Sequence, residues 1–315
     1  KPMLTNKNAV EKAVLIGLML NCKINKEWKW QRKHYDWPDM PKGYQNTISG
    51  GVINALKGTR GIGVDGKFEG IGIWSLHLEE DPASWEPENG KVDYNRSGLP
   101  LVEIITAPDF ETSSEVVSWL RKLIHNLSYL KVVDGNAGIK VDVNVNIAGK
   151  TERVEVKNIN SIENIGKAIN YELERQMKEG GKVKETRRYD ALKNKTIVMR
   201  LKEGAEDYRF IADPDLIDVN LSSGFISEIE GRVPESPDKK LRRLVKEHKI
   251  DKKSASVLAK NIDIVEFFEE VIKKSKLGVK LVLPWVTVEL LRHLNYNKVK
   301  LDEIELSVEH FVKLL

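Results

Sequence analysis

The spacing of apolar residues predicts three helices in the first two thirds of the chain. Apolar or small residues recur at helical spacing from Asn8 to Leu20, just after Thr5 and Asn6, either of which is a suitable N-cap. The same period returns in Ser113–Leu127 and in Ser161–Gln176. These three segments are therefore expected to form amphipathic helices.

Strand patterns alternate with these helices. Ile71–Leu78 and Leu99–Ile105 have the composition of strands, and Ile139–Ile147 alternates apolar with polar residues, as a strand with one wet face does. Arg153–Lys157 is expected to pair with Ile139–Ile147 after a short turn. Two further strands are predicted within Lys184–Arg200.

Two other segments predict a turn and a loop. Asp65-Gly66 lies between short alternating runs and is a hairpin signal. The stretch from Trp28 to Gln45 is rich in aromatic, proline and basic residues and has no helical period. We therefore expect a proline-fixed loop there, and this loop carries Lys33 and Lys42.

The pattern changes near Arg232–Pro237. Before this segment strands and helices mix, whereas after it the period is helical nearly to the end of the chain. The expected helices are Asp238–Glu247, Lys252–Ala259, Ile262–Lys273, Trp285–Leu294 and Ser307–Leu315. We therefore expect an α+β domain over residues 1–232 and an all-α domain over residues 233–315.

Composition excludes several classes of protein. The chain has 315 residues, of which 41% are hydrophobic and 31% charged, and no apolar run approaches membrane-spanning length. It has no secretory signal pattern, and its single cysteine, Cys22, excludes a disulfide framework and a cysteine-rich zinc site. The formal net charge of +4 is modest for a protein that coats nucleic acid. A cytoplasmic protein is the simplest interpretation.

An acid-rich segment, followed by a strand with one acid inside it, is the strongest chemical signal. His77–Asp81 contains a histidine and three acids, and Glu103 lies in the next strand. Carboxylates suit Mg²⁺, and a carboxylate buried in a strand requires a cation or hydrogen bonds. Strand alternation places His77 and Glu79 on one face and Glu80 on the other. A solvated acidic turn is the alternative, but it does not account for a buried Glu103.

Several charged segments are ambiguous when taken singly. Arg32–Gln45 combines basic and aromatic residues, Glu155–Ser161 leads from a strand into a capped helix, and Glu185–Asp190 and Asp207–Leu216 set charges beside aromatics. Taken alone, each is better explained as ordinary surface or an ordinary capped helix than as a ligand site. The chain has no Walker loop, nucleophile elbow, zinc-ligand spacing or dinucleotide glycine pattern.

Taken in order, these segments closely resemble the GatB family, the B subunits of tRNA-dependent amidotransferases. The resemblance rests on motifs spread along nearly the whole chain: Arg32–Tyr35, Pro41–Gln45, His77–Asp81, Asp93–Ile104, Glu155–Ser161, Glu185–Arg188, Asp207–Phe210 and Asp213–Leu216. It implies a cradle domain of antiparallel sheet with helices, followed by a helical domain. It also implies that the family's first strand, with a Gly-Leu-Glu-x-His metal motif, and its tail domain are absent from this chain.

The resemblance further implies an activity, that of an ATP-dependent ligase. Members of the family use ATP and Mg²⁺ to phosphorylate the side-chain carboxylate of Glu on tRNA(Gln) or of Asp on tRNA(Asn). Ammonia then displaces the phosphate and forms the amide. A GatA-like amidase subunit releases this ammonia from glutamine and delivers it through a tunnel, and a small GatC-like subunit clasps the pair.

Site residues are carried over from the matched motifs one by one. Glu80 and Glu103 resemble the metal-site carboxylates of the family. Glu80 also resembles the carboxylate at the tunnel exit, where it would relay a proton from ammonia. The resemblance gives catalytic roles to Lys33 and Lys42, and it assigns a substrate or phosphate pocket to His77, Asp93, Asn95 and Arg96.

Two rival interpretations remain. The archaeal GatE family shares the cradle motifs but carries a large inserted domain, for which the stretch from Asp215 to Pro234 leaves no room. A non-catalytic tRNA-binding or assembly module would need only basic helices such as Lys239–Arg243 and Lys252-Lys253. Mg²⁺-dependent phosphorylation of Glu-tRNA(Gln) would distinguish a catalytic subunit from such a module.

Overall fold

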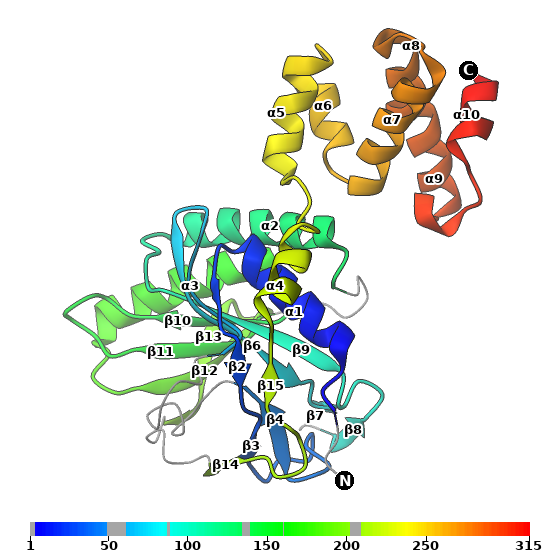
Figure 1. The fold of residues 1–315 in the computed structure, drawn as a ribbon. Helices are drawn as coiled ribbons and strands as arrows, with labels where there is room; N and C mark the ends of the chain where they lie inside the picture. The colour runs from blue at the N-terminus through cyan, green and yellow to red at the C-terminus, as the bar shows by residue number, and fades with distance from the viewer. Residues whose placement is uncertain (1–3, 49–60, 87–88, 134–138, 160, 202–208) are drawn as a thin grey trace. The chain divides into compact units, whose positions relative to one another are not determined.

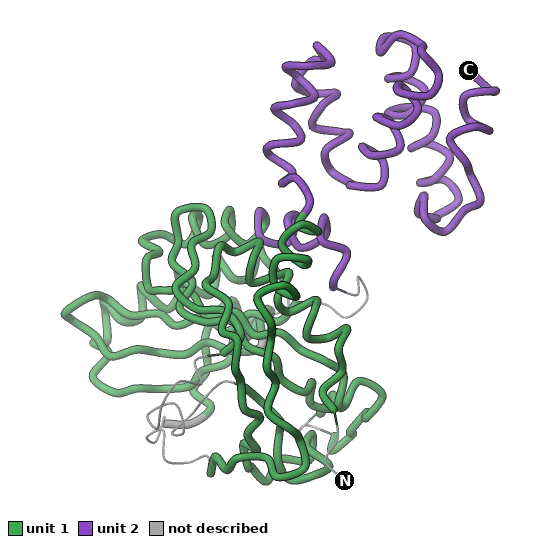
Figure 2. Tube along the Cα trace, viewed as in Figure 1, with its two compact units in different colours: residues 1–121, 134–233 green, residues 122–133, 234–315 purple. Residues whose placement is uncertain are grey.

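The computed structural model describes residues 4–48, 61–86, 89–133, 139–159, 161–201 and 209–315. The chain forms two compact units, drawn in different colours in Figure 2. Unit 1 comprises residues 1–121 and 134–233, and unit 2 comprises residues 122–133 and 234–315. The division expected from the sequence differs mainly in segment 122–133, which the sequence pattern assigns to the first domain.

Unit 1 contains a seven-stranded sheet built around its longest strand (Figure 1). The strand order is β1, β5, β6, β4, β3 and β14, with β9 also paired to β6, and all the pairs are antiparallel. The bounds are β1 Lys23–Ile24, β3 Gln31–His34, β4 Tyr44–Thr47, β5 Gly63–Phe68, β6 Ile71–Glu80, β9 Pro100–Thr106 and β14 Arg209–Ala212. Strand β6 therefore has three partners: β5 along its first part, β4 at Glu79, and β9 from Ile73 onward.

A second sheet of unit 1 is mixed. Its order is β10, β11, β12 and β13, with bounds Val141–Val145, Val154–Ile159, Glu185–Asp190 and Lys195–Leu201. The β11–β12 pair is parallel and the other two pairs are antiparallel. The expectation of purely antiparallel sheet is thus wrong for this pair. Helix α3, Ile162–Glu179, connects β11 to β12, and parallel neighbours need such a crossover in place of a tight turn.

Helices α1, α2 and α3 confirm the predicted helical segments of unit 1. Helix α1 (Lys7–Met19) is capped by Asn6, whose side chain accepts a hydrogen bond from the backbone of Ala9. Thr112 accepts in the same way at the start of α2 (Ser113–Leu130), as Ser161 does at the start of α3. The remaining elements of unit 1 are α4 (Ser223–Glu230), the pair β2 (Glu27–Trp28) with β15 (Val219–Asn220), and the pair β7 (Ser84–Glu86) with β8 (Lys91–Asp93).

The turn predicted at Asp65-Gly66 is wrong. Both residues lie inside β5, which joins β6 through Glu69 and Gly70, and the positive φ angles of these two residues, 48° and 87°, suit a two-residue hairpin turn. A Cβ on Gly66 would lie 2.5 Å from the Sγ atom of Cys22 and 2.8 Å from the carbonyl oxygen of Leu20. The glycine therefore permits close packing inside a strand.

The loop predicted from Trp28 to Gln45 is also partly wrong. Lys33 lies in the short strand β3, and only Lys42 lies in the connection between β3 and β4. Strand β3 reads Gln-Arg-Lys-His and has no apolar residue, so hydrophobic alternation did not reveal it. It is held by backbone pairing on both sides, to β4 and to β14.

Unit 2 is a helical unit around one apolar core that includes Leu258, Val265, Phe268 and Val286. Its elements are α5 Pro237–Glu247, α6 Lys252–Leu258, α7 Ile262–Ser275, α8 Val279–Pro284, the π-helical η3 Trp285–Leu290, α9 Leu291–Asn297, the short 3₁₀ helix η4 Leu301–Glu303 and α10 Val308–Leu314. The expected helix from Trp285 instead begins at Val279 and contains Pro284, followed by the π-helical turn. None of the described helices is long and apolar enough to cross a membrane.

The end of α2 belongs to unit 2 because its polar side chains bind the end of α6. The hydroxyl of Tyr129 donates to the carbonyl oxygen of Ala259 at 2.6 Å, and Nε2 of His125 lies 2.9 Å from the same oxygen. Lys131 pairs with Asp263 at the start of α7. The carbonyl at the end of α6 thus gains hydrogen-bond partners that its own helix does not supply.

A buried carboxylate ties α3 to the second sheet. Glu172 of α3 is fully buried and accepts hydrogen bonds from Arg175 at 2.6 Å, Gln176 at 2.9 Å and Thr196 of β13 at 2.8 Å. Arg187 of β12 lies 3.6 Å from the same carboxylate. Burial raises the pKa of Glu172, but the hydrogen bonds from Arg175, Gln176 and Thr196 outweigh burial and hold the pKa below its ordinary value of 4.5.

Replacing Glu172 by Gln is expected to lower the free energy of unfolding by about 3 kcal/mol at neutral pH, because Arg175 and Arg187 lose a buried counter-charge. The matched control is Glu179→Gln. Glu179 also pairs with Arg175, but its side chain is 64% exposed, so its loss should cost less than about 1 kcal/mol. Urea-induced unfolding followed by circular dichroism measures both variants. Equal losses would show that burial does not set the strength of this pair.

A comparison of the wild type with Glu172→Gln at different pH values tests how this stabilisation depends on pH. A carboxyl group with a depressed pKa in the folded state stabilises the fold above its unfolded-state pKa and loses this contribution as the pH falls through the folded-state pKa. The stability difference between the wild type and Glu172→Gln should therefore be complete at pH 7 and should shrink below roughly pH 4. A difference that stays constant down to pH 3 would contradict the assignment.

Candidate functional site

The candidate site is organised by the alternation of side chains along β6. In the antiparallel pairing with β9, His77 lies opposite Glu103 and Glu80 lies opposite Pro100. Opposite residues share a face of the sheet, and successive residues of one strand point to opposite faces. His77, Glu79 and Glu103 therefore share one face, which we call the histidine face, whereas Glu80 points to the other, which we call the lysine face.

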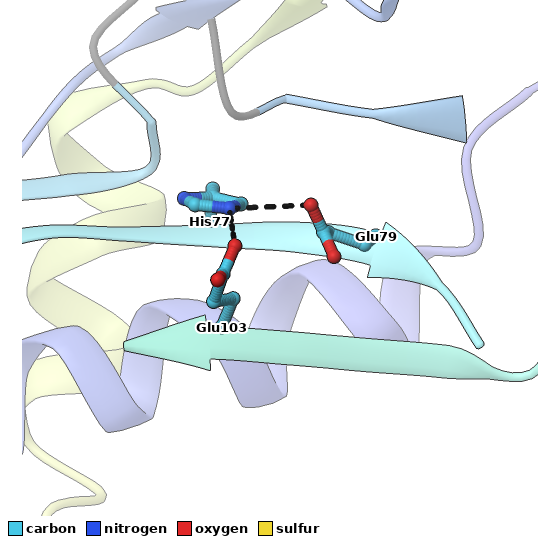
Figure 3. A group of neighbouring side chains, drawn as sticks. All are labelled: His77, Glu79 and Glu103. Atoms are coloured by element: carbon cyan, nitrogen blue, oxygen red, sulfur yellow. Dashed lines mark hydrogen bonds and ion pairs between the residues drawn. The ribbon is translucent and has the colours of Figure 1, made fainter. Parts of the chain in front are cut away.

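On the histidine face, one imidazole joins two carboxylates (Figure 3). Nε2 of His77 lies 2.6 Å from Oε2 of Glu103 and 3.3 Å from Oε1 of Glu79. Among the described residues, these three are the group whose ligand atoms all lie within 4.8 Å of one another. Burial alone would lower the pKa of His77, but the hydrogen bonds and charges of Glu103 and Glu79 raise the pKa to about 9.

The buried acid of this group is Glu79, and the expectation of a buried Glu103 is wrong. The side chain of Glu103 is 51% exposed, whereas that of Glu79 is 10% exposed. The physical reason is that, among the described strands, β9 pairs only with β6 and so forms a sheet edge, while Glu79 lies between β9 and β4. One signal in the sequence pointed to Glu79: it lies two residues after His77, so in a strand the two side chains share a face.

Neighbouring strands hold Glu79 in place. Thr47 of β4 donates to Oε1 of Glu79 at 2.9 Å, and Gln45 donates to Oε2 at 3.2 Å. Burial raises the pKa of Glu79, but His77, the positive charge of Lys33 and the Thr47 hydrogen bond lower it overall. Glu79 is therefore an ionised carboxylate in a buried position, and residues of β3, β4 and β6 compensate its negative charge.

On the lysine face, Glu80 forms an ion pair with Lys42. Nζ of Lys42 lies 2.8 Å from Oε1 and 2.7 Å from Oε2 of Glu80. Asn46 of β4 binds both partners: its side-chain oxygen accepts from Nζ of Lys42 at 2.7 Å, and its backbone N–H donates to Oε2 of Glu80 at 3.1 Å. The pair is partly open to solvent, since the Lys42 side chain is 39% exposed and that of Glu80 is 24% exposed.

The structure thus separates two residues that the resemblance groups as metal ligands. Glu103 lies with His77 and Glu79, whereas Glu80 lies with Lys42 on the other face. Lys33 lies opposite Gln45 in the β3–β4 pairing, and Gln45 donates to Glu79. Lys33 therefore lies on the histidine face as well. Ligand roles for Glu80 and Glu103 stay predictions.

The other predicted pocket residues lie near the β7–β8 pair and the end of β6. Asp93 ends β8 and is exposed, and its Oδ1 accepts a hydrogen bond from the backbone of Asn95 at 3.0 Å. Nε of Arg96 donates at 2.9 Å to Oδ2 of Asp81, the residue that follows β6. Among the described residues, none of these contacts joins Asp93, Asn95 or Arg96 to the His77 group or to the Lys42–Glu80 pair.

The donor set of the histidine face fits a divalent cation. Carboxylate oxygens are the ligands that Mg²⁺ prefers, and an imidazole nitrogen adds affinity for Mn²⁺ and similar ions. Three groups are fewer than the six ligands of Mg²⁺, so water or substrate phosphates would supply the rest. Nδ1 of His77 is buried and has no hydrogen-bond partner among the described residues, which therefore give the ring none of the outer support that ligating histidines usually have.

Metal binding distinguishes the two faces. Glu79→Gln and Glu103→Gln are expected to weaken Mn²⁺ binding by about tenfold or more, because each removes a charged ligand. Glu80→Gln is the matched control, since it alters the adjacent residue of the same strand on the opposite face. Titration of Mn²⁺ monitored by electron paramagnetic resonance measures all three. A loss in Glu80→Gln as large as in Glu103→Gln would instead support the pairing of Glu80 with Glu103.

Known proteins are similar to this sequence along its whole length. A family model described as the GatB/GatE catalytic domain matches residues 1–227. The chain is also similar to proteins named as B subunits of the aspartyl/glutamyl-tRNA(Asn/Gln) amidotransferase. Identity is 44% over 327 residues for the protein of Methanocaldococcus jannaschii, 43% over 320 for that of Methanobrevibacter smithii and 39% over 323 for that of Methanopyrus kandleri. These alignments cover 100% of this chain and 67% or 68% of each relative.

Proposed function

The chain belongs to the family of GatB/GatE catalytic domains, and from that membership we propose that it acts as the B subunit of a tRNA-dependent amidotransferase. The substrates are Glu-tRNA(Gln), Asp-tRNA(Asn) or both, by analogy with the names of its relatives. Unit 1 corresponds in this proposal to the family's cradle domain and unit 2 to its helical domain.

The proposed reaction has two steps. A carboxylate is a poor acyl donor because its oxygen is a poor leaving group. In the first step a side-chain carboxylate oxygen attacks the γ-phosphorus of ATP, and ADP leaves, which gives an acyl phosphate. In the second step the lone pair of ammonia attacks the acyl carbon. Phosphate then leaves with the bonding electrons of the C–O bond, and the nitrogen passes one proton to the departing phosphate, which leaves the amide and hydrogen phosphate.

We assign the first step to the histidine face. When Mg²⁺ is bound there, it neutralises the charge of the transferred phosphoryl group. His77, Glu79 and Glu103 would hold the ion, and Lys33 contributes positive charge on the same face. The buried position of Glu79 supports this assignment, since a fixed and desolvated carboxylate is a strong and well-oriented ligand.

We assign the second step to the lysine face. The carboxylate of Glu80 would accept a proton from ammonium, which leaves neutral ammonia as the nucleophile. Lys42 holds this carboxylate in place by two short hydrogen bonds. The observation that carries the proposal is that Glu79 and Glu80, adjacent in one strand, serve two differently equipped faces of the same sheet.

The proposed partners follow from the same premise. We propose a GatA-like amidase subunit that releases ammonia from glutamine and a GatC-like small subunit, with misacylated tRNA as the substrate-bearing partner. The relatives named above are all called B subunits, whereas the family model covers GatB and GatE alike. A tRNA-binding module without catalysis is the second candidate, and the basic exposed side chains of α5, such as Lys239 and Lys246, favour it.

Replacing Glu103 by Gln is expected to lower Glu-tRNA(Gln)-dependent ADP formation by about a hundredfold or more, because the phosphoryl charge loses its compensation. The assay uses the full-length subunit assembled with its amidase partner, and filter binding measures tRNA affinity, which should stay within about twofold. Glu111→Gln, at an exposed glutamate beyond β9, is the control and should match the wild type. A wild-type complex that binds tRNA but forms no ADP would favour the non-catalytic module.

A further inference from the structure

Asp213 lies just beyond β14 and reaches the lysine face from a distant part of the sequence. Strand β14 pairs antiparallel with β3, and the backbone N–H of Asp213 donates to the carbonyl oxygen of Trp30 at 2.9 Å. The Asp213 side chain is 2% exposed. A buried carboxylate in this position needs several donors, and the structure supplies them.

Five hydrogen bonds hold the Asp213 carboxylate. Oδ1 accepts from the backbone N–H groups of Asp215 at 2.7 Å and Leu216 at 3.3 Å, and Arg32 donates to both oxygens, with Nε 3.0 Å from Oδ2. The side-chain amide of Asn46 donates to Oδ2. Asp213 is thus a rigid acceptor that faces both Arg32 and Asn46.

The contact with Asn46 determines which way its side chain points. An ionised carboxylate only accepts hydrogen bonds, so Asn46 must turn its NH₂ group toward Asp213. The carbonyl oxygen of the same side chain then points toward Lys42 and accepts from its Nζ at 2.7 Å. With the opposite orientation, the NH₂ group of Asn46 would face the ammonium group of Lys42, and donor would face donor.

We propose that Asp213 is a positioning residue for amide formation, acting through Asn46 to fix the Lys42–Glu80 pair. Its carboxylate sets the orientation of the Asn46 amide, and the Asn46 oxygen and backbone N–H then hold Lys42 and Glu80 in register. This inference rests on the proposed function, because it gives the Lys42–Glu80 pair the task of handling ammonia. It adds a residue that makes no contact with the pair itself among the hydrogen bonds of the described residues.

The test uses Asp213→Asn in the full-length subunit assembled with its amidase partner, with ammonium chloride as the nitrogen source and glutamine omitted. The Asn side chain has the same shape but offers Asn46 either an oxygen or an NH₂ group, so the orientation is no longer enforced. The KM for ammonia is expected to rise about tenfold. Glu-tRNA(Gln)-dependent ADP formation should stay within about twofold of the wild type, because it is assigned to the other face.

Asp215→Asn is the matched control. Asp215 also pairs with Arg32, but its side chain is 74% exposed and the hydrogen bond from Asn46 goes to Asp213. Its KM for ammonia should equal that of the wild type. A KM in Asp213→Asn no higher than in Asp215→Asn would overturn the inference. Parallel losses of ADP formation and amide formation would also overturn it, since they indicate a general structural role.

A double-mutant cycle tests the route through Asn46. Asn46→Ala removes the bridge directly and should raise the KM for ammonia by a similar factor, while leaving the Asp213–Arg32 pair in place. In the Asn46→Ala background, Asp213→Asn should then raise the KM for ammonia little further. If the double variant instead raises the KM by the product of the two single effects, Asp213 does not act through Asn46. Failure of the proposed function gives a different result, because the wild-type complex would then form neither ADP nor amide.

Discussion

The alternation of side chains along β6 is the constraint on which the candidate site depends. Adjacent residues of a strand cannot share a face, so Glu79 and Glu80 are forced into different surroundings although they are neighbours in the chain. Glu79 joins an imidazole and a second carboxylate, while Glu80 joins an ammonium group. One strand thus presents two acidic groups with different partners, within a distance set by a single peptide unit.

Charge compensation explains why so many polar residues are concentrated in strands β3, β4 and β6. An ionised carboxylate inside a sheet is costly unless cations and donors surround it. Glu79 is balanced by His77 and the charge of Lys33, Glu80 by Lys42, and Asp213 by Arg32. Short polar strands are stable in this setting because backbone pairing on both sides holds them, as it does β3.

Periodicity in the sequence predicted helices α1, α2 and α3, several helices of unit 2 and the strands β6 and β9, because their apolar residues repeat regularly, but it did not reveal α4. It also separated Glu80 from His77 and Glu79, and the matched motifs drew attention to Glu103, which lies beside His77. Periodicity did not reveal β3, because its residues are polar and help to compensate the carboxylates of the neighbouring strands. It also did not reveal the exposure of Glu103, which depends on the position of β9 at the edge of the sheet. The contact between Asn46 and Asp213 joins residues 167 positions apart, and local patterns carry no information on such pairs.

The pairing of β14 with β3 has a consequence for how the protein is made. Arg32 and Asp213 are separated by 181 residues, so the lysine face is completed only after the polypeptide has been synthesised past β14. During translation, Arg32 and Asn46 leave the ribosome long before the carboxylate that orients them. Closing such a long loop costs about 3 kcal/mol more than closing a hairpin of about four residues, since the entropic cost grows with the logarithm of length. The late arrival of Asp213 therefore affects the timing of folding as well as its free energy, and a chain released early would contain the histidine face without a finished lysine face.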